Sequence, residues 1–82
     1  MTAKEMFEKL EFDWQETNNY IQYEKYRWKH WIFKSKTTIC FWKMFKNISF
    51  YDDLTFDIDN LLLQAILKQV EELGWNNVKD KR

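Results

Sequence analysis

Few residues of this sequence carry side chains that commonly do acid–base, nucleophilic or metal chemistry. His30 could act as a general base, since the unperturbed pKa of histidine is about 6.5. It has no Ser or Cys at a motif spacing and no acid placed to orient its ring, so the sequence favours a surface histidine. Cys40 lies in the apolar stretch TICFW, where burial would raise the pKa of its thiol and make it inert. One His and one Cys also exclude a zinc site of recognisable spacing and an internal disulfide.

Two pairs of acids could in principle bind a cation, Asp52 with Asp53 and Asp57 with Asp59. The glycine and the distal glutamate of a calcium-binding loop are missing from this stretch. Because Asp is common in turns and immediately before helices, these acids are interpreted as turn and cap residues. We therefore expect a protein that is not an enzyme and that uses no metal or cofactor.

The segment from Tyr23 to Lys46 suggests a binding chemistry, because it places an aromatic or a basic residue at almost every other position. Modules that bind single-stranded nucleic acid stack bases on aromatic rings and contact the phosphates with Lys and Arg. The segment lacks the glycines of the RNA-recognition sheet, however. Alternating aromatic residues with lysines are also typical of a small half-buried sheet. The structural interpretation is therefore favoured, and nucleic acid is the second choice of ligand.

The formal net charge is zero, but the charges are unevenly distributed along the chain. Residues 1–19 carry a net charge of −3, residues 20–47 carry +6, and residues 48–82 carry −3. A neutral chain argues against a protein that coats nucleic acid through bulk electrostatics. Acids on the expected helices could instead present carboxylates to the nucleic-acid channel of another protein, although a solvated helix face carries similar charges.

The N-terminal half contains one helical pattern followed by a strand pattern. Thr2 and Glu5 form a capping box, and apolar residues follow at helical spacing as far as Leu10. From Tyr20 to about Phe50 the apolar period is two, which predicts three antiparallel strands. The expected turns are at residues 27–29, 34–37 and 46–47, and a fourth, short edge strand is expected between residues 48 and 56.

The C-terminal pattern is helical again. Asp59 is expected to cap a helix over residues 60–73. Its apolar stripe consists of Leu63, Ile66, Leu67, Val70 and Leu73. Gly74 supplies the left-handed residue that ends the helix, and Trp75 can fold back on Val70 in a Schellman ending.

These elements predict a two-layer α+β fold: a short N-terminal helix, a three- or four-stranded antiparallel sheet, and a C-terminal helix packed with the first helix on one face. Without Pro, with a single Gly and without repeats, residues 1–82 are expected to form a single domain, of which residues 76–82 form a frayed polar tail. No apolar run approaches the roughly 20 residues that span a bilayer, and the N-terminus does not resemble a signal peptide. A cytoplasmic location is therefore expected.

With both helices on one face, the other face of the sheet would be open to water or to a partner. Successive side chains of a strand point to opposite faces of the sheet, so odd- and even-numbered residues separate. This alternation, here called parity, predicts four residues of the first two strands on the inner face: Ile21, Tyr23, Trp31 and Phe33. Their alternates are expected to face outward: Tyr20, Gln22, Glu24, Tyr26, Trp28, His30, Ile32 and Lys34. For the third strand, parity leaves two alternatives open, in which either Ile39 with Phe41 or Cys40 with Trp42 faces inward.

Several stretches resemble a group of small uncharacterised accessory proteins encoded by temperate phages of low-GC Gram-positive bacteria. They are TAKEMFEKL (residues 2–10), YIQY (residues 20–23), the strand that contains Phe33, and LLQAI-x-KQ-x-EELGW within residues 62–75. The resemblance implies an accessory phage protein in the cytoplasm of the infected cell. Glu11 stands where such proteins usually have Gly, which predicts a less sharp end to the first helix. Leu61 stands where they usually have an acid, and an exposed Leu61 would indicate a partner surface.

We therefore expect a non-enzymatic phage accessory protein that binds, as an inhibitor, a protein of the host or of its anti-phage defence. The contact would use either the outer sheet face or the acidic helical side. The candidate partner-binding residues are Tyr26, Arg27, Trp28, Lys29, His30, Lys34 and Leu61. The alternative is a module that binds single-stranded nucleic acid with its basic aromatic sheet face. A monomer or a homodimer is expected, and no membrane partner.

Overall fold

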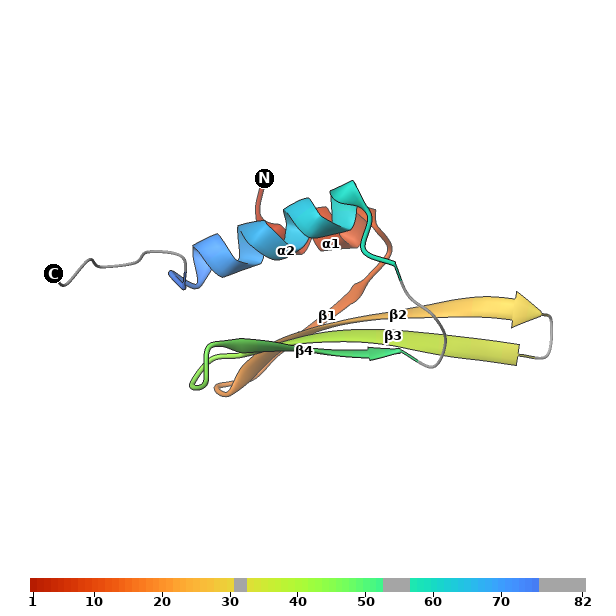
Figure 1. The fold of residues 1–82 in the computed structure, drawn as a ribbon, viewed down its shortest axis with the longest axis horizontal. Coiled ribbons are helices and arrows are strands. Elements are labelled where there is room, and N and C mark those ends of the chain that lie inside the picture. The colour runs from red at the N-terminus through yellow and green to blue at the C-terminus, as the bar shows by residue number, and fades with distance from the viewer. Residues whose placement is uncertain (31–32, 53–56, 76–82) are drawn as a thin grey trace, which may run out of the picture.

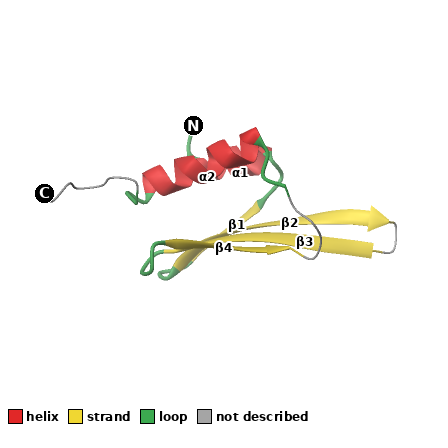
Figure 2. Ribbon diagram, viewed as in Figure 1, coloured by secondary structure: helices red, strands yellow, loops and turns green. Residues whose placement is uncertain are grey.

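Two helices and four strands make up the part of the chain that the computed structural model describes, which is residues 1–30, 33–52 and 57–75, with side chains except at 27–30 and 33–35. The elements are α1 (Ala3–Lys9), β1 (Asp13–Glu16), β2 (Tyr20–His30), β3 (Phe33–Trp42), β4 (Asn47–Asp52) and α2 (Asn60–Glu72). The strands form one antiparallel sheet in the order β1-β2-β3-β4, and both helices lie on one side of it (Figure 1). The expected two-layer α+β fold is confirmed (Figure 2). Neither α1 nor α2 is long and apolar enough to cross a lipid bilayer.

The N-terminus of α1 is fixed by the expected capping box. The Glu5 N–H donates to the Thr2 hydroxyl at 3.1 Å, and the Thr2 N–H donates to the Glu5 carboxylate at 2.9 Å. These two bonds satisfy amides that have no partner within the helix. The bond from the Thr2 backbone also holds the pKa of Glu5 below its usual value.

The C-terminus of α1 is a complete Schellman motif, although the sequence predicted a less sharp end. The Phe12 N–H donates to the Phe7 carbonyl, and the Glu11 N–H donates to the Glu8 carbonyl, at 3.0 and 2.9 Å. The rings of Phe7 and Phe12 meet edge to face at 5.5 Å, which is the hydrophobic contact of this motif. Glu11 adopts the left-handed conformation, with φ 71°, that usually requires glycine. The packing of Phe12 therefore imposes the left-handed turn on Glu11, although a residue with a Cβ disfavours this conformation.

Replacing Glu11 with glycine is expected to stabilise the protein by about 1 kcal/mol. A residue with a Cβ loses roughly 1–2 kcal/mol in the left-handed region, and the greater freedom of an unfolded glycine offsets part of the gain. The exposed Glu11 side chain makes no hydrogen bond or ion pair among those described for the chain. The urea midpoint of unfolding, followed by far-ultraviolet circular dichroism, measures the change.

Gly74 offers the matched control for this substitution. It ends α2 with φ +78°, and a Cβ built there would meet no atom within 4 Å. Gly74→Ala therefore isolates the backbone cost, and we expect it to lower the free energy of unfolding by about 1 kcal/mol. A Glu11→Gly variant with an unchanged or lower urea midpoint would contradict the explanation.

Both ends of α2 agree with the sequence. The Leu62 N–H donates to the Asp59 carboxylate at 2.8 Å, which confirms Asp59 as the N-cap. At the other end the Gly74 N–H donates to the Glu71 carbonyl at 3.0 Å, and the Trp75 N–H donates to the Val70 carbonyl at 3.1 Å. This is the predicted Schellman ending.

The predicted apolar stripe of α2 is partly wrong. Leu63 and Leu67 are exposed, and Leu62, Ala65, Ile66 and Gln69 form the buried face instead. The buried face of α2 is rotated about the helix axis relative to the predicted stripe, because α2 packs on α1 as well as on the sheet. The small residues Ala3 and Ala65 are fully buried, as is typical where two helices approach closely.

Two predicted turns are also wrong. Residues 27–29 belong to β2, and residues 34–37 belong to β3, so that β2 and β3 form a long antiparallel pair. Basic clusters suggested turns there, but long side chains on strands can keep their charged ends in water. The sequence also missed β1, a short polar edge strand in which Trp14 pairs with Tyr23. The expected fourth strand is confirmed at the other edge as β4.

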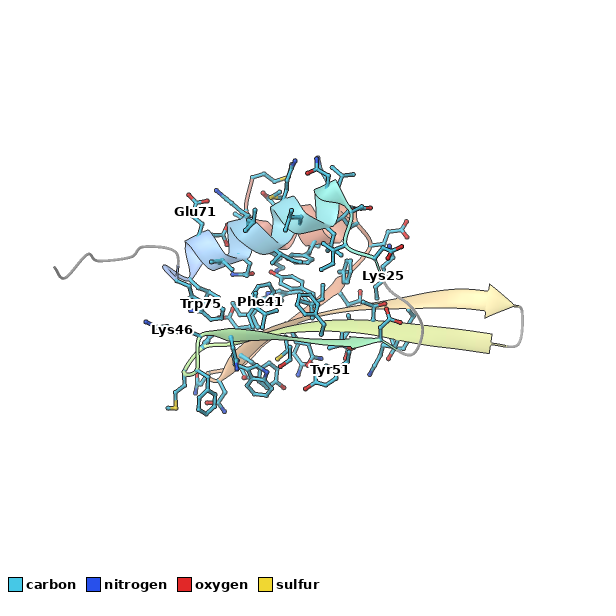
Figure 3. All side chains as sticks on the ribbon, in the orientation of Figure 1. Lys25, Phe41, Lys46, Tyr51, Glu71 and Trp75 are labelled. Atoms are coloured by element: carbon cyan, nitrogen blue, oxygen red, sulfur yellow. The ribbon has the colours of Figure 1, made fainter. Side chains whose placement is uncertain are left out.

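The core lies between the helices and the sheet and is mostly aromatic. The Phe7 ring of α1 stacks on the Tyr23 ring of β2 at 3.7 Å, and Phe41 of β3 meets both rings edge on. The Tyr23 hydroxyl donates to the side-chain oxygen of the buried Gln69 at 2.5 Å, which ties β2 to α2. Trp75 lies beside Phe41 between the two layers (Figure 3).

Candidate protein-binding surface

The face of the sheet opposite the helices, here called the outer face, follows from the strand register. Ile21 and Tyr23 are buried in the core, as predicted, so their alternates face outward. The choice left open for β3 is settled, because Ile39 and Phe41 belong to the core. The described residues of the outer face on β2, β3 and β4 are Tyr20, Gln22, Glu24, Tyr26, Lys36, Thr38, Cys40, Trp42, Asn47, Ser49 and Tyr51.

Side chains of the sheet itself cover the centre of the outer face. Thr38 and Cys40 are buried there, although no helix covers them. Beside them the rings of Tyr20 and Trp42 meet at 5.2 Å, and the Trp42 indole N–H donates to the Ser49 hydroxyl at 3.1 Å. As the sequence suggested, burial raises the pKa of the Cys40 thiol. The centre of the outer face therefore serves packing and presents no reactive group.

A row of polar side chains crosses the outer face farther along the sheet. The Gln22 amide donates to the Glu24 carboxylate at 2.7 Å, and the Lys36 ammonium lies 3.5 Å from the same carboxylate. The Lys36 nitrogen also lies 5.9 Å from the centre of the Tyr26 ring. Glu24 therefore opposes one of the positive charges that the sequence had suggested for a basic platform.

Two tyrosines are the most accessible aromatic residues among the described side chains of the outer face. Tyr26 of β2 is 47% exposed, and Tyr51 of β4 is 58% exposed. Tyr51 extends from the sheet on the side away from the helices (Figure 3). The exposure predicted for Tyr26 is therefore found.

The other candidate residues of the sheet are placed only by their backbone. Arg27, Trp28, Lys29 and His30 lie in β2 and Lys34 lies in β3, with Trp28 directly opposite Lys34 in the register. Their side chains, and residues 31 and 32, lie outside the described part of the structure. The partner-binding role of these five residues remains a prediction.

Leu61 lies in the other layer of the molecule. It is 60% exposed and borders a shallow hollow of about 310 Å³ between the two helices, which Met1, Met6 and Leu10 also line. The predicted exposure is found, but the sheet separates Leu61 from Tyr26. The two residues therefore cannot belong to one small contact surface.

Among the described residues, the most exposed apolar side chains lie in the four-residue loop between β3 and β4, beside the turn expected at residues 46–47. Sequence reasoning did not include them in the candidate surface. Met44 is 82% exposed and Phe45 is 72% exposed. The Lys46 N–H closes the loop by donating to the Trp42 carbonyl at 2.9 Å, and Lys46 has a left-handed φ of 54°. The stretch FWKMF continues the aromatic pattern of the strand, so the sequence predicted a turn only at residues 46–47 and left Met44 and Phe45 in the strand.

Neighbouring residues hold this loop at one end of the sheet. The Lys43 N–H donates to the Asn19 carbonyl at 2.9 Å. The Lys43 ammonium donates to the Glu16 carboxylate at 2.8 Å and to the Thr17 carbonyl at 2.9 Å. The loop therefore rests on the turn that joins β1 to β2, and its two apolar side chains are presented from a fixed backbone.

Among the side chains that the structure describes, few positive charges of the basic segment lie on the outer face. The Lys25 ammonium lies on the helical side, 5.5 Å from the Phe12 ring centre, and borders a small hollow with Asp57 and Asp59. Lys43 faces Glu16, as described above. Among the described residues, no three His, Cys, Asp or Glu side chains come close enough to hold one metal ion.

Comparisons with known proteins do not assign a family or a function to this surface. No protein-family model, curated protein or solved structure matches the chain. The function must therefore be argued from the outer face and from the loop beside it.

Proposed function

We propose that this chain is a non-enzymatic protein-binding module, a phage accessory protein that binds and inhibits a protein of the host or of its anti-phage defence. The resemblance of residues 2–10 and 62–75 to phage accessory proteins supports the biological setting. The contact surface consists of Met44 and Phe45 in the β3–β4 loop together with Tyr26 and Tyr51 on the outer face.

The exposure of Met44 and Phe45 is the observation that supports this proposal best. Two adjacent large apolar side chains in water cost the free protein free energy that a partner would recover by covering them. Met and aromatic residues are also enriched in protein–protein interfaces. Because the loop is already held by Lys43, little conformational entropy would be lost on binding.

Single-stranded nucleic acid is the second candidate ligand. Phe45 stands beside the exposed Lys46, and an aromatic ring next to a cation is the unit from which such sites are built. Lys36 and Lys43, however, already face carboxylates within the molecule. The described outer face thus offers few cations for phosphates, and a protein partner is favoured.

A double variant in the loop tests the proposal. Met44→Ser with Phe45→Ser is expected to keep the fold, because both side chains are exposed, and to abolish capture of the partner. Immobilised wild-type protein, verified as folded, is incubated with a lysate of a low-GC Gram-positive host, and retained proteins are identified by mass spectrometry. The matched control is Leu61→Ser, an exposed apolar residue of the other layer, which should retain the same proteins.

The proposal requires a protein that wild type and Leu61→Ser retain and that the loop variant retains at least about tenfold less. Retention by the loop variant equal to wild type, or no retained protein at all, would refute it. Quenching of tryptophan emission by an oligonucleotide, weakening steeply with salt, would instead identify the nucleic-acid function.

A further inference from the structure

The strands β2 and β3 continue beyond the other two strands of the sheet. β1 pairs with β2 only as far as Glu24, and β4 pairs with β3 only from Thr37 onward. Residues 25–30 and 33–36 belong to the β2–β3 pair and, in the described part of the chain, have no further strand at either edge. This two-stranded extension, here called the arm, reaches past β4 and past both helices (Figure 1). At about 3.4 Å per residue, residues 26–30 make it about 17 Å long.

The arm carries a concentrated positive charge. Residues 25–36 contain no acid and five bases, which are Lys25, Arg27, Lys29, Lys34 and Lys36. Two residues of the arm therefore cannot form an ion pair with each other. Like charges held close together repel one another, and an anionic ligand relieves this repulsion.

Three of these bases indicate a ligand. Lys25 and Lys36 already have contacts elsewhere in the chain, as described above. A ligand of the arm is therefore inferred from Arg27, Lys29 and Lys34, which the strand register places along the extension. The inference does not require Lys25 or Lys36 to be available.

The register distributes these cations over both faces of the arm. Arg27 has the parity of the core residue Tyr23 and so belongs to the inner face. Lys34 is paired with Trp28 at the alternate parity and so belongs to the outer face. Lys29 lies at the register shift that follows Trp28. A single strand of nucleic acid stacked on one face would leave the cations of the other face without phosphates, so a ligand with phosphates on both sides of the arm is favoured.

The width of the arm selects the kind of nucleic acid. A two-stranded antiparallel ribbon fits the major groove of B-form DNA, which is about 12 Å wide, whereas the minor groove is only about 6 Å wide. Both walls of that groove carry phosphates, so the cations of both faces have counterparts there. The major groove of A-form RNA is too narrow and deep for side chains to read. Platforms for single strands, by contrast, are commonly broader sheets of four strands.

We propose that the arm binds double-stranded DNA by lying in its major groove, with Arg27, Lys29 and Lys34 opposite the phosphates. The contact is mainly electrostatic and largely independent of base sequence. A chain without net charge can bind in this way, because exposed charges farther apart than about 8 Å are largely screened at physiological salt. The arm lies at the opposite end of β3 from the β3–β4 loop and shares only Tyr26 with the candidate protein-binding surface. The inference does not rest on the proposed function.

Fluorescence anisotropy of a labelled DNA duplex of about 20 base pairs tests the proposal at low salt, about 50 mM. Wild type is expected to bind at micromolar concentration. Arg27→Gln with Lys34→Gln removes one cation from each face and is expected to weaken binding at least about tenfold. The matched control is Lys9→Gln with Lys68→Gln, which removes the same charge from the helical layer and should bind like wild type. Circular dichroism confirms that both double variants are folded.

The salt dependence of binding counts the phosphate contacts independently of the size of this loss. Three contacts predict that the logarithm of the association constant falls against the logarithm of the salt concentration with a slope of about −2.7. The arm variant should retain a slope of about −0.9, and the helical-layer control should keep the wild-type slope.

Other nucleic acids separate the major groove from a general attraction to phosphates. Duplex RNA and single-stranded DNA of the same length are expected to bind wild type at least about tenfold more weakly than duplex DNA. Met44→Ser with Phe45→Ser should bind duplex DNA like wild type, which tests this site separately from the protein-binding surface. No binding of duplex DNA by wild type, equal losses in the arm variant and its control, or RNA or single strands bound as tightly as duplex DNA would overturn the proposal.

Discussion

Replacing Phe7 with alanine is expected to lower the free energy of unfolding by about 3–5 kcal/mol. The Phe7 side chain is fully buried, stacks on Tyr23 at 3.7 Å and meets Phe12 and Phe41 edge on. Removing a buried phenylalanine ring costs roughly 3–5 kcal/mol, because transfer free energy is lost and a cavity remains. A chain of this length has a stability of roughly 4–12 kcal/mol, so this single change removes a large part of it.

Urea unfolding followed by tryptophan fluorescence measures this loss. Phe45→Ala is the matched control, since the same ring is removed from an exposed position, and we expect a change within about 0.5 kcal/mol. The two variants separate burial from residue type. A cooperative transition for Phe7→Ala with a loss below about 1 kcal/mol would show that the aromatic cluster does not hold the two layers together.

Helix ends were the features that the sequence predicted best. The capping box at Thr2 and Glu5, the cap at Asp59 and the ending at Gly74 are all found. Each of these depends on residues within about five positions along the chain, so a local pattern contains the necessary information. Glu11 shows the limit of that information. Its left-handed conformation is imposed by the packing of Phe12 in the core, and the residue type gave no indication of it.

Strand boundaries were predicted less well because tertiary pairing decides them. Residues 27–29 and 34–37 are polar enough to suggest turns, yet they extend β2 and β3, where each strand supplies hydrogen-bonding partners for the other. The strand β1 contains a single apolar residue, Trp14, and forms because β2 offers it an edge. The turn residues Thr17 to Asn19 ahead of Tyr20 were the available indication that a strand precedes them.

The buried face of α2 could not be chosen from the stripe alone. The adjacent leucines 61–63 span most of the helix circumference, and any apolar arc must omit some of them. The arc that is buried centres on Leu62 and Gln69, because α1 covers one flank and because the Tyr23 hydroxyl gives the Gln69 amide a partner. A buried polar residue of this kind is predictable only once its partner is known.

The candidate surface was predicted in part. Parity placed Tyr26 on the outer face correctly, and Leu61 is exposed as expected. Met44 and Phe45 were missed because their exposure results from the length of the β3–β4 loop, which the alternation of apolar residues does not specify. The described lysines also do not form one basic surface, since Glu16 and Glu24 come from distant positions in the sequence to oppose two of them.

The stability of the protein is expected to fall steeply with pH above about 10, through Tyr23. Burial raises the pKa of Tyr23 above its ordinary value, and the negative charges of Glu72, Glu16 and Glu8 raise it further. Between the unfolded pKa of about 10 and the higher folded pKa, the folded state holds a proton that the unfolded state has lost. The contribution is therefore fully present below pH 10 and is lost at about 1.4 kcal/mol for each further pH unit.

Tyr23→Phe separates this titration from other alkaline effects. The variant loses the bond to Gln69 and is expected to be about 1–3 kcal/mol less stable at neutral pH, because the buried amide loses its partner. Above pH 10 its urea midpoint should decline less steeply than that of wild type, since no tyrosine remains in the core to be deprotonated. Tyr51→Phe, which removes an exposed hydroxyl from the outer face, should keep the wild-type slope. Equal slopes for Tyr23→Phe and wild type would mean that the alkaline loss has another origin, and the Tyr23–Gln69 bond would then account for stability only as a neutral hydrogen bond between sheet and helix.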